Sequence, residues 1–232
     1  MAYGRFDTPK QLITLEADQV LEYAAAAQKH YRPDYQYHNW EHALSVASGT
    51  EIIAQKLRTR GITVAQGALA VAAAWHDAGY HEDHTSAGFH TKEGYSAALL
   101  EEFLEDKPVG IFEKTLMLKS IIATYSGHAE LRMPYELILH RADIANIGGP
   151  TDEFISNTIK LWHEQQLITG NKIPWLKFIE GSAHFVRLTA TEHDEESLAH
   201  LIDPEDTTLD VNDLPFRIAA LENLEKLASY EM

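Results

Sequence analysis

The stretch from Leu69 to Trp75 is apolar on every side of a helix, and it constrains the fold more than any other part of the sequence. A helix without a polar face has to be surrounded by other elements, so this one is predicted to lie in the middle of the core. Thr63 is placed to cap a helix from Val64 to Ala78, and Gly79 is placed to end it in a left-handed conformation. A chain of 232 residues without cysteine is long enough to bury such a core without disulfides.

Apolar residues recur at intervals of three and four along most of the remaining chain, which is the period of an amphipathic helix. The few short windows that resemble strands do not alternate cleanly between apolar and polar residues. We therefore expect an all-α protein, a compact bundle of roughly seven to nine helices. The other helices are expected at residues 11–30, 39–60, 91–105, 108–125, 135–147, 151–167, 174–188 and 215–230.

The formal net charge of -16 limits the classes of partner. Nucleic-acid polymers and anionic membranes recruit Lys and Arg, so the acidic balance speaks against both. Nine acidic residues and neither Lys nor Arg lie between Thr191 and Asp213, and without these charges the other 209 residues carry -7. A small anionic substrate is therefore compatible with the chain. Because no apolar leader or bilayer-length stretch is present, we expect a cytoplasmic protein, and the sequence allows a homo-oligomer.

Histidine and aspartate residues gather in a pattern that indicates a metal site. His38 and His42 share one helical face if the helix has begun by His38. His76 and Asp77 are adjacent, and neighbours on a helix point about 100° apart, so a ligand common to both has to lie beyond the helix end. Asp143 follows an apolar stripe, where a carboxylate needs a partner. The segments concerned are YHNWEHA (37–43), AAAWHDAGY (72–80) and HRADIANIG (140–148).

We predict that His42, His76, Asp77 and Asp143 bind a divalent metal. Together they offer two imidazole nitrogens and two carboxylate oxygens. Mixed nitrogen and oxygen ligation without thiolate suits manganese, iron, nickel, zinc or magnesium, and it leaves positions for water in an octahedral site. Such a metal would lower the pKa of a bound water and neutralise charge on a phosphate.

The order His, His-Asp, Asp on a helical chain resembles the HD-domain superfamily of metal-dependent phosphohydrolases, over about residues 34–190. In that family these positions are the metal ligands. The resemblance implies a compact HD-domain bundle with three parts: an N-terminal helical segment (1–33) packed on the core, the catalytic core (34–190), and an acidic segment with a C-terminal helix (191–232).

The segment YHNWEHA is also similar to the corresponding segment of the cyclic-nucleotide phosphodiesterases, where the His of Tyr-His-Asn donates a proton to the leaving oxygen. This likeness implies that His38 is the general acid. Asp77 is the second expected catalytic residue, able to bridge to a second, mostly water-ligated metal. The overall layout, including Glu93 and His128, is closer to the small predicted HD phosphohydrolases of bacteria. Glu93, His128 and Lys119 are the expected substrate-binding residues.

One feature departs from the phosphodiesterase pattern. Those enzymes have another His four positions after the His of the His-Asp pair, whereas Tyr80 stands there in this chain and His81 follows one position later. A second-metal environment of the phosphodiesterase kind is therefore not implied.

The expected activity is hydrolysis of a phosphomonoester or phosphodiester of a small nucleotide or related metabolite by metal-activated hydroxide. Two alternatives remain open because one fold hosts varied chemistry. A di-iron oxygenase on the same scaffold would need two more His ligands, for which His90 and His128 are available. A metal- or nucleotide-binding regulator would bind its ligand without turnover.

Overall fold

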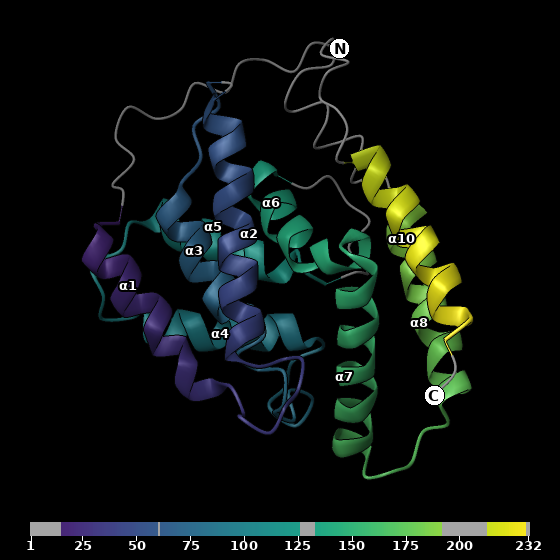
Figure 1. Cartoon of the computed structure of the whole chain (residues 1–232). Helices are drawn as coiled ribbons and strands as arrows, with labels where there is room; N and C mark the ends of the chain where they lie inside the picture. Colours follow the sequence, from purple (N-terminus) through teal and green to yellow (C-terminus); the bar gives the residue numbers. More distant parts are fainter. Residues whose placement is uncertain (1–14, 60, 126–132, 192–212, 231–232) are drawn as a thin grey trace.

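The computed structural model describes residues 15–59, 61–125, 133–191 and 213–230, and every regular element within these ranges is a helix (Figure 1). The predicted all-α class is therefore confirmed. None of the described helices is both long and apolar enough to cross a membrane. The helices are α1 (Ala17–Ala26), η1 (Ala27–His30), α2 (Trp40–Thr59), α3 (Gln66–Trp75), α4 (Lys92–Phe103), α5 (Ile111–Ile122), α6 (Pro134–Asp143), η2 (Ala145–Gly148), α7 (Thr151–Thr169), α8 (Trp175–Thr191) and α10 (Asp213–Ala228).

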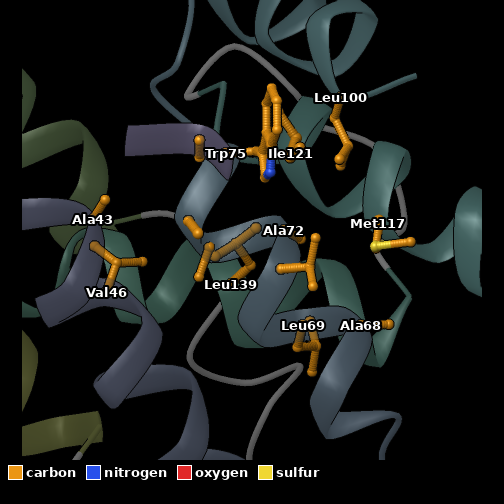
Figure 2. Packing of buried hydrophobic residues seen from close by; sticks show 14 of the residues in the cluster. Ala43, Val46, Ala68, Leu69, Ala72, Trp75, Leu100, Met117, Ile121 and Leu139 are labelled. Atoms are coloured by element: carbon orange, nitrogen blue, oxygen red, sulfur yellow. The ribbon is translucent and has the colours of Figure 1, made fainter. Parts of the chain in front are cut away.

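Among the described residues there are two hydrophobic cores, and helix α3 lies at the centre of the larger one, as its all-round apolar sequence predicts (Figure 2). Leu69, Val71 and Trp75 are completely buried in it. The helix packs against α1, α2 and α5, and α6 also lies against it. This environment explains why α3 carries no polar face, and it fixes the position of the residues that follow Trp75.

A second hydrophobic core joins the C-terminal helices to the 3₁₀ helix η2. Phe216 of α10 lies against Gly148, where an added methyl group would meet its ring at 2.2 Å. Asn223 of α10 donates hydrogen bonds to the carbonyl oxygens of Ile147 (3.0 Å) and Gly149 (2.9 Å). Helix α10 therefore holds η2 in place, and η2 directly follows α6.

Both predicted ends of α3 differ from the structure. The helix begins at Gln66 rather than Val64, and Thr63 is not its cap. Val64, which precedes the helix, packs against the larger core instead of forming the first helical turn. Among the described glycines the left-handed conformation is adopted by Gly61, Gly88 and Gly170, and not by Gly79.

Gly79 is needed for a close approach between chain segments. A methyl group added to Gly79 would stand 2.6 Å from the ring of Tyr95. The N–H group of Gly79 donates a hydrogen bond of 2.9 Å to the hydroxyl of Ser96. The glycine thus lets the chain after α3 run against α4, whose N-terminus is capped by Thr91.

Candidate metal centre and adjoining cavity

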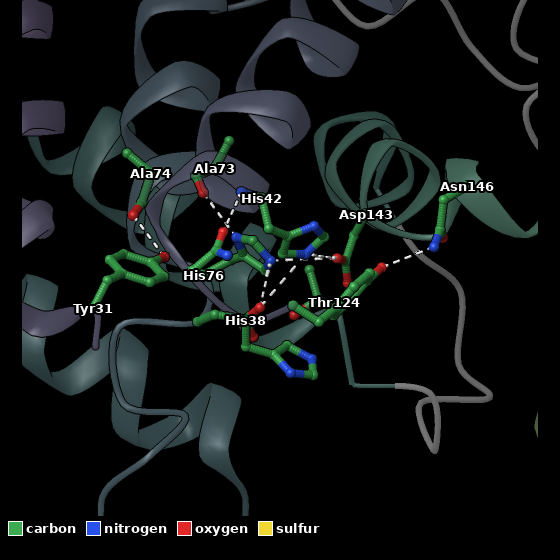
Figure 3. Close-up of polar contacts among 12 residues, drawn as sticks. Tyr31, His38, His42, Ala73, Ala74, His76, Thr124, Asp143 and Asn146 are labelled. Atoms are coloured by element: carbon green, nitrogen blue, oxygen red, sulfur yellow. Dashed lines mark hydrogen bonds and ion pairs between the residues drawn. The ribbon is translucent and has the colours of Figure 1, made fainter. Parts of the chain in front are cut away.

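Three helix ends place the predicted ligands around one point (Figure 3). His42 lies in the first turn of α2, His76 and Asp77 directly follow α3, and Asp143 is the last residue of α6. The helix predicted over 135–147 ends at Asp143, and the chain continues as η2. Side chains at helix ends are not confined to one helical stripe, so adjacent His76 and Asp77 reach the same point.

The side-chain atoms of these residues lie within a few ångströms of one another. Nε2 of His42 is 3.2 Å from Oδ1 of Asp143 and 3.6 Å from Oδ2 of Asp77. Nε2 of His76 is 3.0 Å from Oδ2 of Asp77 and 3.3 Å from Oδ1 of Asp143. His42, His76 and Asp143 each offer a ligand atom, all within 4.8 Å of one another, and such a group could hold a metal ion. Asp77 contacts both imidazoles.

The protonation of His76 fits a metal ligand. Its Nδ1 lies 2.7 Å from the carbonyl oxygen of Ala73, which can only accept a hydrogen bond, so Nδ1 carries a proton. Its Nε2 is buried without a hydrogen-bond partner among the described residues and faces two carboxylates. A lone pair opposed by two carboxylates is unfavourable unless a proton or a cation lies between them. The donor set therefore fits a divalent cation.

His76 and the two carboxylates each stabilise the charged form of the other. Burial alone would lower the pKa of His76, but the carboxylates of Asp77 and Asp143 outweigh burial and raise it well above its ordinary value. Burial alone would raise the pKa of Asp77 and of Asp143, and His76 above all lowers both. Both carboxyl groups are therefore ionised at neutral pH, as metal ligation requires.

His38 lies beside this cluster but outside α2, which begins at Trp40. Asn39 accepts a hydrogen bond of 3.0 Å from the backbone N–H of His42 and so caps the helix. The condition under which His38 and His42 would share one helical face is therefore not met. The position of His38 is set by Glu164 of α7, whose Oε2 accepts hydrogen bonds from the backbone N–H groups of Tyr37 (3.0 Å) and His38 (2.9 Å).

Glu164 also pairs through Oε1 with Nδ1 of the His38 ring. Its side chain is only 1% exposed. Burial alone would raise the pKa of Glu164, but its hydrogen bonds to His38 and to the backbone outweigh burial and lower it. The carboxylate thus fixes Nδ1 and leaves Nε2 of His38 as the ring nitrogen for a proton transfer.

Tyr80 covers the other side of His38. The two rings are stacked, with centroids 3.5 Å apart and an angle of 16° between their planes. The ammonium of Lys92 lies 3.6 Å from the centroid of the Tyr80 ring. Burial, and after it the charges of Glu164 and Asp77, raise the pKa of Tyr80, so it remains a neutral phenol. The residue that departs from the phosphodiesterase pattern is therefore a packing partner of the candidate general acid.

Tyr37 supports His42 in a similar way. Its ring centroid lies 4.7 Å from that of His42, and its hydroxyl accepts a hydrogen bond of 2.9 Å from Asn146 of η2. Burial, with the nearby charges of Asp143 and Asp77, raises the pKa of Tyr37. The C-terminal core therefore reaches the candidate metal site through η2.

A cavity of about 770 Å³ opens from the site. His38, Tyr80, Lys92 and Asp143 line one part of it. The remaining lining residues are Tyr37, Ile144, Asn146, Ile147, Phe154, Thr158, Leu161, Gln165, Asn171, Lys172, Ile173, Pro174, Lys177, Phe178, Gly181, Ser182, Phe185 and Val186.

Neither of the two predicted substrate-binding residues that the structure describes lines the cavity. Glu93 lies in the first turn of α4 and does not line the cavity. Lys119 is exposed on α5, also away from the cavity. His128 lies outside the described residues, as does most of the acidic segment, at 192–212. The roles of these residues stay predictions, and so do the three-part division of the chain and the ligand roles of the cluster.

Glu164 is the main residue that sequence reasoning missed. It lies 126 positions from His38 and belongs to no local motif. Its only signal is its place three residues after Leu161, a residue that lines the cavity. That signal is weak, because an isolated Glu in a helix is more often exposed than buried.

No protein-family model and no curated protein matches the sequence. Among solved structures, the crystal structure of the phosphodiesterase domain of Salpingoeca rosetta rhodopsin phosphodiesterase matches with a TM-score of 0.63. The match covers 90% of this chain and 80% of that one, at 16% sequence identity. Identity at this level shows likeness of fold alone, so the chain shares the all-helical fold of that phosphodiesterase domain.

Proposed function

We propose that the protein is a metal-dependent phosphohydrolase that cleaves a phosphate ester of a small nucleotide or related metabolite. The observation that carries this proposal is the Nε2 atom of His76, buried and facing two carboxylates, next to a cavity that also exposes His38. The fold match to a phosphodiesterase domain supports the same reaction class.

His42, His76, Asp77 and Asp143 would hold the metal. A divalent metal bound there supplies Lewis acidity, which lowers the pKa of water and offsets negative charge on the phosphate. Asp143 belongs to this cluster and also lines the cavity, so a phosphate ester in the cavity would lie beside the cluster.

His38 would donate the proton that the leaving oxygen needs. Glu164 fixes Nδ1, and the stacked ring of Tyr80 restricts rotation of the imidazole. A proton held on Nε2 is then presented in one orientation, which is what general acid catalysis requires. Loss of a positioned general acid typically costs about 10²- to 10⁴-fold in rate.

The decisive experiment couples metal analysis of the purified protein to hydrolysis of a phosphatase and phosphodiesterase panel with manganese, magnesium, iron and nickel. Asp77→Ala should lose both bound metal and activity, and full hydrolysis by that variant would refute the proposal. His38→Ala should keep its metal and lose rate, chiefly with poor leaving groups. If His38→Ala releases the metal instead, its assignment as proton donor is wrong.

The same preparation distinguishes the two alternatives. Oxygen uptake that depends on iron, without phosphate release, would indicate the di-iron oxygenase. Tight binding of a nucleotide without turnover would indicate a regulator. Among the described residues, the group that could hold a metal ion contains two histidines, His42 and His76.

A further inference from the structure

The cavity beside the candidate metal site lies between two consecutive helices. Its walls include four residues from one face of α7, which recur at intervals of three and four. Helix α8 packs on α10, and its side chains form the facing wall. The turn that joins the helices, with Gly170 in the left-handed conformation, is followed by lining residues 171–174. The cavity is thus built by α7, α8 and their connection as well as by the metal-site segments.

The charged lining residues are mostly basic, although the whole chain carries a net charge of -16. Apart from Asp143 and the titratable His38, they are Lys92, Lys172 and Lys177. None of these three lysines takes part in an ion pair within the described part of the chain. The ammonium of Lys92 already lies over the ring of Tyr80, so Lys172 and Lys177 remain to face an occupant of the cavity.

The charge balance of the site decides how many negative charges the occupant should carry. A divalent cation would be offset by the carboxylates of Asp77 and Asp143, which leaves the lysines uncompensated. A phosphodiester brings one negative charge, whereas a phosphomonoester brings about two at neutral pH. Clefts lined by one sign of charge concentrate ligands of the opposite sign. The lysines therefore favour a ligand with more charge than a simple diester.

The rest of the cavity wall is largely apolar. Ile147, Phe154 and Leu161 line one side, and Phe178 and Phe185 come from α8. Phe185 is 41% exposed, so its ring is available for contact. Apolar walls with a few polar groups are typical of pockets that bury the body of a small ligand.

We propose that the substrate is a polyanionic phosphate ester with an apolar body: a dianionic monoester, or an ester whose alcohol part carries a second anionic group. Lys172 and Lys177 recognise the charge, and the phenylalanine side chains of α7 and α8 contact the body. This inference rests on the proposed function, because it assigns the ligand of the same site.

Binding of uncleavable probes tests the inference without requiring turnover. The probes are benzylphosphonate, its monomethyl ester and 4-(carboxymethyl)benzylphosphonate, which carry two, one and three negative charges above the second phosphonate pKa. In calorimetric titration of the metal-loaded protein at low salt, the probe with three negative charges should bind most tightly and the probe with one should bind most weakly. In K172Q/K177Q the affinity for the most charged probe should fall by roughly 10-fold, the low end of electrostatic focusing.

The monomethyl ester should bind K172Q/K177Q nearly as it binds the wild type, which separates the lysine effect from direct attraction to the metal. The matched control is Lys160→Gln, since Lys160 lies on α7 outside this cavity and contacts Asn157. Circular dichroism melting of each variant shows that it is folded.

The probe affected most identifies the source of the charge. An equal loss for the benzylphosphonate and its carboxymethyl derivative indicates recognition of a monoester dianion, and a loss confined to the derivative indicates a second anionic group. The inference is overturned if K172Q/K177Q binds all three probes as the wild type does. If the lysine-dependent preference is present but no phosphate ester is cleaved, the proposed function fails while the ligand assignment stands.

Discussion

Replacing Glu164 by glutamine changes one charge at the contact that positions His38. The wild-type carboxylate accepts two backbone N–H groups through one oxygen and pairs with Nδ1 of His38 through the other. In the variant the amide oxygen can still accept the N–H groups. Its NH₂ group then faces Nδ1, which has to accept a hydrogen bond instead, so a contact with a carboxylate becomes a contact between neutral groups.

The magnitude follows from the contacts that change. A hydrogen bond to a charged group contributes about 1.5–3 kcal/mol and a neutral one about 0.5–1.5 kcal/mol, so the free energy of unfolding should fall by about 1–2 kcal/mol. The rate should fall by about 10²-fold, the lower limit for a general acid, because His38 remains present but the contact that orients its ring is weakened.

Urea unfolding and steady-state hydrolysis of the best panel substrate measure both effects. Glu180→Gln, which removes an exposed carboxylate of α8, is the matched control and should stay within about 0.5 kcal/mol of the wild type. If Glu164→Gln keeps both the stability and the rate of the wild type, Glu164 does not position His38 and the reasoning is refuted.

The pH dependence of stability gives an independent test of the same contact. Because the pKa of Glu164 is lowered on folding, its carboxylate stabilises the folded state above the unfolded pKa of about 4.3. That contribution is lost as the pH falls through the folded pKa. The difference in unfolding free energy between the wild type and Glu164→Gln should therefore be largest at neutral pH and shrink in acid.

Three further predictions concern the metal and the packing around it. Mn²⁺ added to chelator-treated protein at 100 times its Kd should raise the unfolding free energy by about 2.7 kcal/mol, and Asp143→Asn should abolish the increase in a thermal melt. Gly79→Ala should cost about 1–3 kcal/mol in urea unfolding, because the new methyl group would stand 2.6 Å from the ring of Tyr95; wild-type stability would show that the two segments can separate freely. Asn223→Ala removes two hydrogen bonds to the η2 region and should cost about 2–4 kcal/mol, whereas an unchanged urea midpoint would contradict the role given to α10.

Sequence patterns correctly predict those features that are set by residues close together in the chain. The apolar run from Leu69 to Trp75 requires a central helix wherever its neighbours lie, and the structure buries α3 accordingly. The adjacent pair His76 and Asp77 requires a common point beyond that helix, and the distances agree. Helix class and the residues of the candidate metal site were therefore accessible from the order of residues along the chain.

The tertiary structure alone decided which distant groups complete the site. Glu164 meets His38 across 126 positions because α7 carries it to the segment that precedes α2, and no local pattern encodes that contact. In the sequence, Tyr80 is only the residue that stands where the phosphodiesterases have a histidine. The folded chain shows that its ring is stacked on His38. Lys172 of the α7–α8 connection and Lys177 of α8 come to line one cavity in the same way, through the packing of separate segments. Hydrophobic periodicity determines what a segment becomes, but a pocket depends on how segments pack, which is settled by shape and charge across the whole chain.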